Sequence, residues 1–183
     1  IYTGIVDSSE YTCFENIKKL PPGFSLIIEK NKKYKFKKWY FLNDHKSSCK
    51  DKKKIIDLIY NSVVLRTRGD VNIATLLSGG IDSSFINSLL TKFSKKSNLR
   101  FKIFHGSSSN IKTDESYYAK YLCKKLDQNL NIKMPSYKEF RENIKKICYV
   151  QDEPFGSTSI FMQYFVMKEV KKHKCKILLD GQG

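Results

Sequence analysis

Residues 76–84, LLSGGIDSS, combine residue types that bind phosphate groups. An apolar run ends in Ser78-Gly79-Gly80, and the acidic residue Asp82 follows shortly after. Glycines permit positive φ angles and let backbone N–H groups approach a ligand with no Cβ in the way. A helix that begins directly after them adds N–H donors without intrahelical partners and the positive end of its dipole. The segment therefore predicts an anion-binding loop at the carboxyl end of a strand, where open α/β sheets bind ligands.

The side chains of this loop indicate which kind of anion it binds. Ser78, Ser83 and Ser84 offer hydroxyl donors, whereas the carboxylate of Asp82 would repel a phosphate unless a divalent cation stood between them. We therefore expect Asp82 to bind Mg²⁺ and so to be bridged to phosphate oxygens. The alternative is a tight turn in which Asp82 or Ser83 only caps the helix. The phosphate loop of kinases and GTPases and the dinucleotide fingerprint are both absent from the sequence.

The elements that must position this loop follow from the hydrophobic periodicity. Runs of β-type residues predict strands, and apolar residues at spacings of three and four predict helices. The predicted strands are residues 71–77, 100–105, 131–134 and 176–179, and the predicted helices are residues 51–66, 82–95, 114–126, 137–149 and 159–172. This alternation predicts an α/β fold with a doubly wound, mostly parallel sheet and helices on both faces.

Residues 1–42 follow a different pattern. Residues 25–29 and 34–40 are short runs of β-type residues separated by a polar turn, which predicts a β-hairpin. Residues 43–50 are polar and rich in serine and charge, and we expect them to form a linker. The remaining residues, 51–183, are then expected to form a second domain.

The charge of the chain raises the question of a polyanionic partner. Lys and Arg number 34 against 18 Asp and Glu, which gives a formal net charge of +16. Surfaces that recognise nucleic acids depend on the planar guanidinium of Arg, yet nearly all of these basic residues are lysines spread along the chain. We therefore expect solvated lysine-rich faces and no nucleic-acid partner.

Hydropathy and cysteine usage bear on the compartment. No apolar run approaches the roughly 20 residues that span a membrane, so we expect no membrane partner. The five cysteines are scattered without a C-x-x-C pair, which favours small buried residues in a reducing compartment and a cytoplasmic location. The three histidines, among them His105, are isolated in the sequence, and we expect ordinary surface or core side chains.

The loop Ser78–Ser83 resembles the pyrophosphate loop of the N-type ATP pyrophosphatases, which include asparagine synthetase, GMP synthetase, NAD synthetase and several tRNA-modifying enzymes. Its surroundings resemble the synthetase domain of the glutamine-dependent asparagine synthetase family. Upstream residues resemble the last strands of that family's glutaminase domain. The segments that carry the resemblance are Asp70-Val71, Leu76-Leu77, Asp152-Glu153-Pro154 and residues 178–183 (LLDGQG), with residues 14–23 (FENIKKLPPG) and Trp39 upstream.

The resemblance implies a fold and a reaction. The fold is that of the adenine nucleotide alpha-hydrolases, preceded in residues 1–42 by a β-hairpin remnant of a glutaminase domain of the N-terminal nucleophile type. ATP would adenylate the side-chain carboxylate of aspartate and release pyrophosphate, and ammonia from glutamine would then displace AMP to form asparagine. The implied partners are ATP, aspartate and glutamine-derived ammonia, with Mg²⁺ as cofactor and a homodimer as the full-length enzyme.

Carried over by position, the resemblance also implies an ATP site. Asp82 and Ser78 would be catalytic, and Asp82 would hold the metal. Ile103 would line the adenine and ribose pocket, with ordinary core packing as its alternative. Asp152 and Glu153 would serve the amino-acid substrate, or form a solvated pair at a helix start. The residues expected to bind ATP and its pyrophosphate are Leu77, Ser78, Gly79, Gly80, Asp82, Ser83, Ser84, Ile103, Asp180 and Gly181.

The chain departs from the family's pattern at three points. The family's glutaminase nucleophile is an N-terminal cysteine, and Cys13, within the expected strand region, does not correspond to it. The sequence ends at Gly183, where the family continues with acidic residues that complete the metal site. Gln182 stands where the family often has glutamate, which argues against an acid–base role there. We therefore expect a fragment of a larger ligase, inactive by itself.

Other functions share this loop. A related amidotransferase could use the same chemistry on a sugar or another carboxylate acceptor, or to close a β-lactam. A tRNA-modifying ATP pyrophosphatase would suit the basic composition, although the chain lacks a C-x-x-C pair and is poor in Arg. A binding module without catalysis is the remaining alternative.

Overall fold

The computed structural model describes residues 9–45 and 50–181 of the chain. It divides into two compact units, one of residues 1–50 with 151–156 and one of residues 51–150 with 157–183. We call them unit 1 and unit 2 and describe each by itself. The sequence-based boundary keeps residues 151–156 in the second domain, whereas their contacts group them with unit 1. One of these contacts is an ion pair of 3.7 Å between Lys19 and Glu153.

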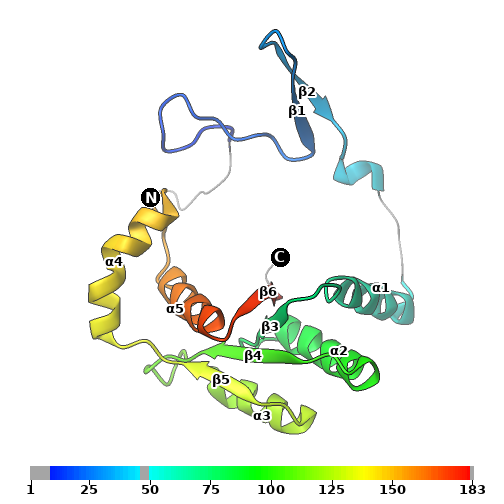
Figure 1. Ribbon diagram of the computed structural model, residues 1–183, viewed down its shortest axis with the longest axis vertical. Coiled ribbons are helices and arrows are strands. Elements are labelled where there is room, and N and C mark those ends of the chain that lie inside the picture. The colour runs from blue at the N-terminus through cyan, green and yellow to red at the C-terminus, as the bar shows by residue number, and fades with distance from the viewer. Residues whose placement is uncertain (1–8, 46–49, 182–183) are drawn as a thin grey trace. The chain divides into compact units, whose positions relative to one another are not determined.

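Unit 1 is built on the predicted hairpin (Figure 1). Strands β1 (Phe24–Ile28) and β2 (Tyr34–Lys38) pair antiparallel, with Leu26 opposite Phe36. A short 3-10 helix, η1 (Leu42–His45), follows in the segment expected to be a linker. Cys13 lies at a bend between the bridged residues Tyr11 and Lys18, so the expectation that it lies in a strand is wrong.

Unit 2 contains a four-stranded parallel sheet in the order β5-β4-β3-β6. From β3 the chain winds outward through β4 and β5 and then returns to place β6 on the other side of β3, so the sheet is doubly wound, as predicted. The strands are β3 (Asn72–Leu76), β4 (Phe101–Gly106), β5 (Leu130–Lys133) and β6 (Cys175–Leu179). The helices are α1 (Lys52–Leu65), α2 (Ile81–Ser97), α3 (Ser116–Leu126), α4 (Tyr137–Gln151) and α5 (Ser159–Lys172).

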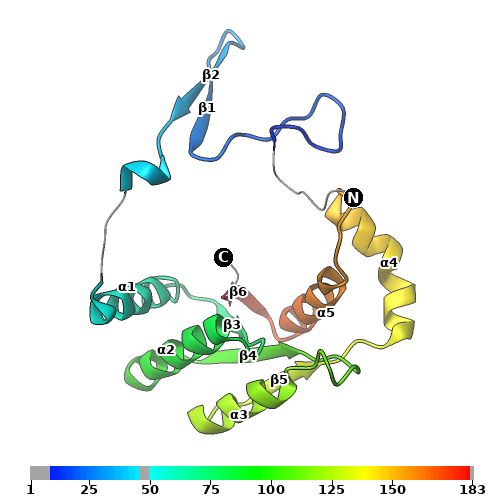
Figure 2. The same ribbon diagram turned by 180° about the vertical axis from the view of Figure 1, so that it is seen from behind.

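Helices cover both faces of this sheet, which confirms the predicted fold class (Figures 1 and 2). Because side chains alternate along a strand, Ala74 and Phe104 face one side and pack against Val166 and Val170 of α5. On the other side, Ile73 packs with Leu89 and Leu90 of α2 and with Val63 of α1, and Ile103 packs against α3. Burial of apolar surface between these layers holds the strand ends in place.

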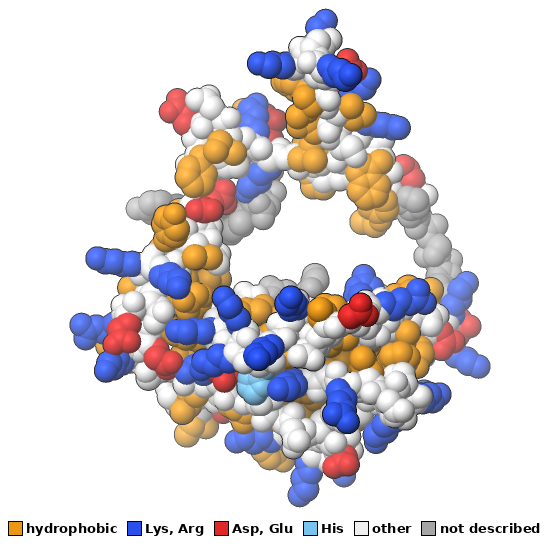
Figure 3. Space-filling view, in the orientation of Figure 1, with side chains coloured by type: hydrophobic (Ala, Val, Ile, Leu, Met, Phe, Trp, Pro, Cys, Tyr) orange, Lys and Arg blue, Asp and Glu red, His pale blue; other side chains and the backbone are white. Residues whose placement is uncertain are grey.

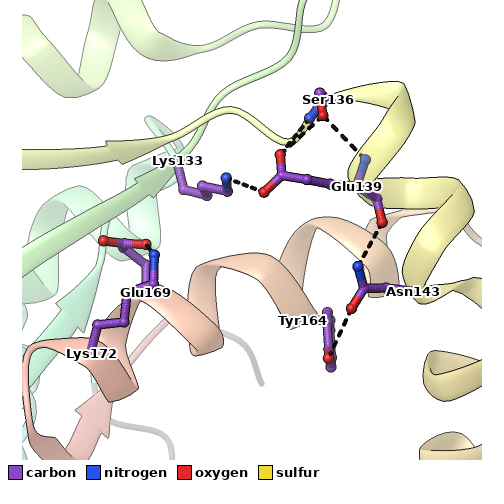
Figure 4. A network of polar contacts seen from close by, with 7 residues as sticks. All are labelled: Lys133, Ser136, Glu139, Asn143, Tyr164, Glu169 and Lys172. Atoms are coloured by element: carbon purple, nitrogen blue, oxygen red, sulfur yellow. Dashed lines mark hydrogen bonds and ion pairs between the residues drawn. The ribbon is translucent and has the colours of Figure 1, made fainter.

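A polar network at the carboxyl end of β5 fixes the start of α4 (Figure 4). The Ser136 hydroxyl accepts from the N–H of Glu139 at 3.2 Å, and the Glu139 carboxylate accepts from the N–H of Ser136 at 2.9 Å, which is a capping box. Lys133 donates to the same carboxylate at 2.7 Å. Farther along α4, the rings of Phe140 and Phe161 lie 4.5 Å apart and join α4 to α5.

The cysteines follow the sequence-based expectation only in part. Cys123 and Cys175 are buried in the core of unit 2, and burial raises the pKa of both thiols. Cys13 and Cys148 are exposed, so the expectation of burial is wrong for these two.

Candidate functional site

The loop that leads from β3 to α2 has the conformation that the glycines predict. Gly79 has a φ of +100°, and a Cβ there would lie 3.0 Å from the Cβ and the carbonyl oxygen of Glu115. Gly80 is the N-cap of α2, and the first intrahelical bond runs from the Ser84 N–H to the Gly80 oxygen at 3.1 Å. The N–H groups of residues 81–83 precede that bond, so α2 itself does not use them.

Two serine hydroxyls fold the loop onto itself. The Ser83 hydroxyl accepts from the N–H of Ser78 at 3.1 Å, and the two hydroxyl oxygens are 2.9 Å apart. The Ser78 hydroxyl also accepts from the N–H of Gly80 at 3.2 Å. The sequence predicts these hydroxyls as donors to a ligand, and the structure adds that they shape the loop. The catalytic role expected of Ser78 stays a prediction.

The side-chain amide of Asn87, which sequence reasoning missed, holds the start of α2 against β3. Asn87 of α2 is fully buried and accepts from the Thr75 hydroxyl at 2.6 Å. It donates to the carbonyl oxygens of Leu76 at 2.9 Å and of Ser83 at 2.8 Å. Asn87 thereby ties the first turn of α2 to the end of β3. The signal in the sequence was a single amide within the apolar stretch of the helix.

Two cavities open beside the loop. The cavity that we call the switch-point cavity has a volume of about 250 Å³ and lies where β3 and β6 diverge, lined by Ser78, Asp82 and Asp180 among others. A second cavity of about 300 Å³, the β3–β4 cavity, is lined by Leu77, Ser78, Phe104, His105 and Glu115 among others. Open α/β sheets bind ligands at such a switch point.

Gly181 closes the switch-point cavity against the start of α2. A Cβ at this position would lie 2.8 Å from the Ser83 nitrogen and 3.1 Å from the Cβ of Asp82. Real Cβ atoms do not approach that closely, so a glycine is required for the chain beyond β6 to reach the helix N-terminus. Gly181 and the loop, predicted for one site, are therefore neighbours.

Asp82 lies where a magnesium ligand is expected, and its role as one stays a prediction. It is exposed on the switch-point cavity, which Asp180 also lines. Among the described residues, no three His, Cys, Asp or Glu side chains lie together in a way that could hold a metal ion. Mg²⁺ is usually held by one or two carboxylates together with phosphate oxygens, so two aspartates on a phosphate-sized cavity fit this ion.

The other residues expected at the ATP site divide into two groups. Leu77 lines the β3–β4 cavity. Ser84 lies partly buried in the first turn of α2. Ile103 is 1% exposed, packs against Ala119 of α3 and lines neither cavity. The residues of β4 that border a cavity follow it, beginning at Phe104. The role of Ile103 in an adenine pocket stays a prediction, and its position is that of a core residue.

The proposed substrate residues lie outside unit 2. Asp152 and Glu153 belong to unit 1, where Asp152 adopts a φ of +58° and Glu153 pairs with Lys19. Neither residue is part of the loop after β3. Their role toward the amino-acid substrate stays a prediction. The expectation concerning Gln182 falls outside the described residues.

His105 is a buried core side chain, one of the two positions expected from the sequence, and both of its ring nitrogens have hydrogen-bond partners. It is 2% exposed on β4, and its Nδ1 lies 2.7 Å from the carbonyl oxygen of Leu77. Its Nε2 lies 3.0 Å from the hydroxyl of Ser116, which donates to Asp114 at 2.8 Å. The Ser116 hydrogen bond lowers the pKa of Asp114 below its usual value of 3.8. A histidine two residues after Ile103, on the same side of a buried strand, was the available signal.

The surface shows lysines dispersed over both units. In Figure 3 the Lys and Arg side chains are spread among hydrophobic and acidic ones on the visible face. The absence of a nucleic-acid partner stays a prediction. Within residues 9–45 and 50–181, no helix has the length and apolar character needed to cross a membrane.

Comparison with known proteins gives a family match for most of the chain. The model of the family described as Asparagine synthase matches residues 54–183. A Methanocaldococcus jannaschii protein named as a glutamine-hydrolysing asparagine synthetase is 33% identical over 96% of this chain. The glutamine-hydrolysing asparagine synthetase 1 of Bacillus subtilis is 31% identical over 92% of this chain. The matched parts make up 34% and 26% of these two relatives, so the chain spans about a third of the first and about a quarter of the second.

Solved structures show a weaker likeness. The NH3-dependent NAD synthetase of Campylobacter jejuni shares 16% identity with a TM-score of 0.49, covering 74% of this chain and 58% of that one. The U34-tRNA thiolase NcsA of Methanococcus maripaludis shares 18% identity with a TM-score of 0.47, covering 75% of this chain and 48% of that one. Neither likeness adds to the assignment.

The matched residues 54–183 include the whole parallel sheet, the loop after β3 and Gly181. The sequence match and the site geometry therefore concern the same part of the molecule, and the chain belongs to the asparagine synthase family.

Proposed function

We propose that unit 2 is the ATP-binding part of an amidotransferase that activates the side-chain carboxylate of aspartate and converts it to asparagine. The observation that carries this proposal is the loop of residues 78–80, which joins β3 to the start of α2 beside the switch-point cavity. Gly79 allows the turn, Gly181 closes the cavity, and Asp82 faces it. The family match supports the same class of reaction.

The first step would transfer AMP to the carboxylate. A carboxylate oxygen of aspartate attacks the α-phosphorus of ATP, the bond from that phosphorus to the bridging oxygen breaks, and pyrophosphate leaves with the electron pair. Negative charge then grows on the leaving group. The N–H groups of Ile81, Asp82 and Ser83, which α2 does not use, are suited to bind that charge at the positive end of the helix dipole.

Asp82 would hold the metal in this step, with Asp180 on the same cavity. When bound, Mg²⁺ would neutralise charge on the departing pyrophosphate. The donors of the loop are preformed by hydrogen bonds of Ser78 and Ser83, so they need no rearrangement as the charge develops. One preorganised donor of this kind is typically worth about 10²–10³ in rate.

The second step would form the amide. The nitrogen of ammonia attacks the acyl carbon of the adenylate, AMP leaves with the electron pair, and a proton is lost from nitrogen. We propose glutamine as the source of the ammonia, through a glutaminase domain to which residues 1–42 would belong. The names of the two relatives support this source.

The proposal extends to the context of the enzyme. We infer a cytoplasmic homodimer whose partners are small molecules. Light scattering of the purified full-length protein tests the dimer, because a monomer at micromolar concentration would contradict it.

Exchange of labelled pyrophosphate into ATP by the full-length protein tests the first step. We expect exchange that depends on aspartate and Mg²⁺. Exchange driven instead by sugar or β-amino carboxylates would assign a related amidotransferase, and exchange that requires tRNA would assign a modification enzyme. No exchange with any acceptor, while ATP still binds, would make unit 2 a binding module and overturn the proposal.

The variant Asp82→Asn tests the metal assignment within the same assay. Asparagine is well tolerated at the start of a helix, so the melting temperature without ligand should barely change. The loss of one carboxylate should lower aspartate-dependent exchange by about 10² or more. Asp57→Asn, an equal change of charge at an exposed position of α1, is the control and should exchange normally. An Asp82→Asn protein that unfolds while its folded fraction exchanges normally would give Asp82 a structural role in the first turn of α2 and overturn the metal assignment.

A further inference from the structure

His105 reaches the phosphate loop from the strand next to it. It lies near the end of β4 and is one of the residues that line the β3–β4 cavity. The Nδ1 atom lies 2.7 Å from the carbonyl oxygen of Leu77, the residue directly before the loop. The contact spans 28 residues of sequence.

The peptide unit between Leu77 and Ser78 is held at both of its polar atoms. His105 binds its carbonyl oxygen, and the Ser83 hydroxyl accepts from its N–H at 3.1 Å. The plane of this peptide is thereby set by one side chain from β4 and one from α2.

The hydrogens available in this network can be counted. The Leu77 carbonyl oxygen only accepts, so Nδ1 of His105 donates to it at 2.7 Å. Asp114 is an ionised carboxylate that also accepts from Ser107 and the N–H of Ser108, so the Ser116 hydroxyl donates to it at 2.8 Å. The same hydroxyl lies 3.0 Å from Nε2 of His105, so it joins the ring to Asp114.

The ring of His105 is therefore held at both of its nitrogens. Nδ1 fixes the Leu77 carbonyl, and Nε2 contacts the Ser116 hydroxyl, which is itself bound to Asp114. A buried site strengthens hydrogen bonds of this kind, so the ring has one well-defined orientation.

Residues 114–116, which carry this network, also lie against the loop at Gly79. Glu115, between Asp114 and Ser116, lies so close to Gly79 that a Cβ on the glycine would be 3.0 Å from it. Displacement of residues 114–116 would therefore disturb the chain at two positions, Leu77 directly before the loop and Gly79 within it.

We propose that His105, doubly hydrogen-bonded between the Leu77 carbonyl and the Ser116–Asp114 pair, is a positioning residue that orients the phosphate loop. The inference rests on the proposed function of the loop. It adds a residue that touches neither the pyrophosphate nor the metal ligand and acts through the Leu77 peptide. Its effect should therefore fall on the rate of the chemical step more than on the binding of ATP.

Two substitutions at position 105 separate positioning from core filling. Asparagine places its amide nitrogen where Nδ1 stands and can still donate to Leu77, but it loses the contact with the Ser116 hydroxyl, which keeps only Asp114. Glutamine matches the volume of histidine more closely and reaches toward Ser116, but it cannot hold the Leu77 carbonyl in the same way. If His105 acts by orienting the Leu77 carbonyl, His105→Asn should retain more activity than His105→Gln. If His105 only fills space in the core, His105→Gln should retain more.

The assay is aspartate-dependent pyrophosphate exchange by the full-length protein. We expect kcat to fall by about 10²-fold in His105→Gln, the loss typical of a misplaced catalytic group, and by about tenfold in His105→Asn. The KM for ATP should change less than about threefold in both. His173→Gln, at a histidine near Lys102 and away from both cavities, is the control and should behave as wild type. Equal losses in the two variants, or a larger loss for asparagine, would overturn the inference.

A spectroscopic measurement tests the network independently of activity. In protein labelled with ¹⁵N-histidine, the ring signals of His105 are assigned by their loss in His105→Asn. We expect Nδ1 to carry hydrogen, as its contact with the Leu77 carbonyl requires, and the spectrum to change in Ser116→Ala. A wild-type ring whose Nδ1 carries no hydrogen, or a spectrum unchanged in Ser116→Ala, would overturn the inference. If the wild type exchanges no pyrophosphate at all, the proposed function fails, and this spectrum still decides the state of the network.

Discussion

Replacement of Glu139 by glutamine should weaken unit 2 in a way that depends on pH (Figure 4). The carboxylate accepts from Lys133 at 2.7 Å and from the N–H of Ser136 at 2.9 Å. The hydrogen bond from Lys133, followed by that from the backbone of Ser136, lowers the pKa of Glu139 from 4.5 to about 2. Glutamine at this position can still complete the capping box, so the substitution removes the charge and leaves the helix start intact.

The size of the effect follows from the pKa and the exposure. A change from 4.5 to about 2 corresponds to at most about 3.4 kcal/mol, at 1.36 kcal/mol per pKa unit. The Glu139 side chain is 37% exposed and that of Lys133 is 22% exposed, so solvent screens the pair. We therefore take about 1 kcal/mol, the upper end of the range measured for exposed pairs. For a domain of this size, that loss lowers the melting temperature by about 2–4 °C.

The sign with pH is set by the lowered pKa. The folded state holds the ionised form more tightly than the unfolded state, so this contribution is fully present above about pH 4.5 and is lost as pH falls toward 2. The difference between wild type and Glu139→Gln should therefore be about 1 kcal/mol at pH 7 and less than half of that at pH 3.

Urea unfolding of both proteins at pH 7 and pH 3 measures this difference. The control is Glu142→Gln on the same helix, because the Lys138–Glu142 pair has a separation of 3.9 Å and side chains 85% and 59% exposed. The control should change stability by less than about 0.5 kcal/mol at both pH values. A Glu139→Gln protein that loses as much at pH 3 as at pH 7, or no more than the control, would refute the reasoning.

Two further predictions concern the loop and its helix. In Gly181→Ala the new Cβ would stand 2.8 Å from the Ser83 nitrogen, so the start of α2 must shift, and aspartate-dependent exchange should fall by about 10–100-fold. Gly156→Ala, whose Cβ would meet nothing within 4 Å, is the control, and equal losses in the two would contradict the close approach. The Thr91 hydroxyl is buried and has no hydrogen-bond partner in the described structure, so Thr91→Val should raise the free energy of unfolding by about 1 kcal/mol. A decrease in urea unfolding experiments would show that the hydroxyl has a partner.

Local sequence patterns predicted the elements and the loop. Each strand and helix of unit 2 depends on a periodicity that can be read within about a dozen residues, and each is present close to its predicted bounds. The conformation of the loop is also local, because only glycine suits the φ of +100° at position 79 and because a helix N-terminus needs an N-cap at Gly80. The proximity of Gly181 was predicted through the family resemblance.

Contacts distant in sequence were not predictable in the same way. Whether Ile103, Phe104 or His105 borders a cavity depends on the pairing of β4 with β3, where a shift of one residue exchanges the two faces of a strand. Asn87 and His105 became visible as supports of the loop only when their partners on β3, 12 and 28 residues away, were brought beside them.

The sequence by itself therefore determined the alternation of strands and helices, the anion-binding turn and the carboxylate at position 82. The tertiary structure decided which side chains hold that turn in place. The physical reason is the separation in sequence between the residues that determine each feature. Backbone conformation and helix capping depend on near neighbours in the chain. The partners of a buried polar group depend on strand order and register, which arise from the packing of the whole sheet.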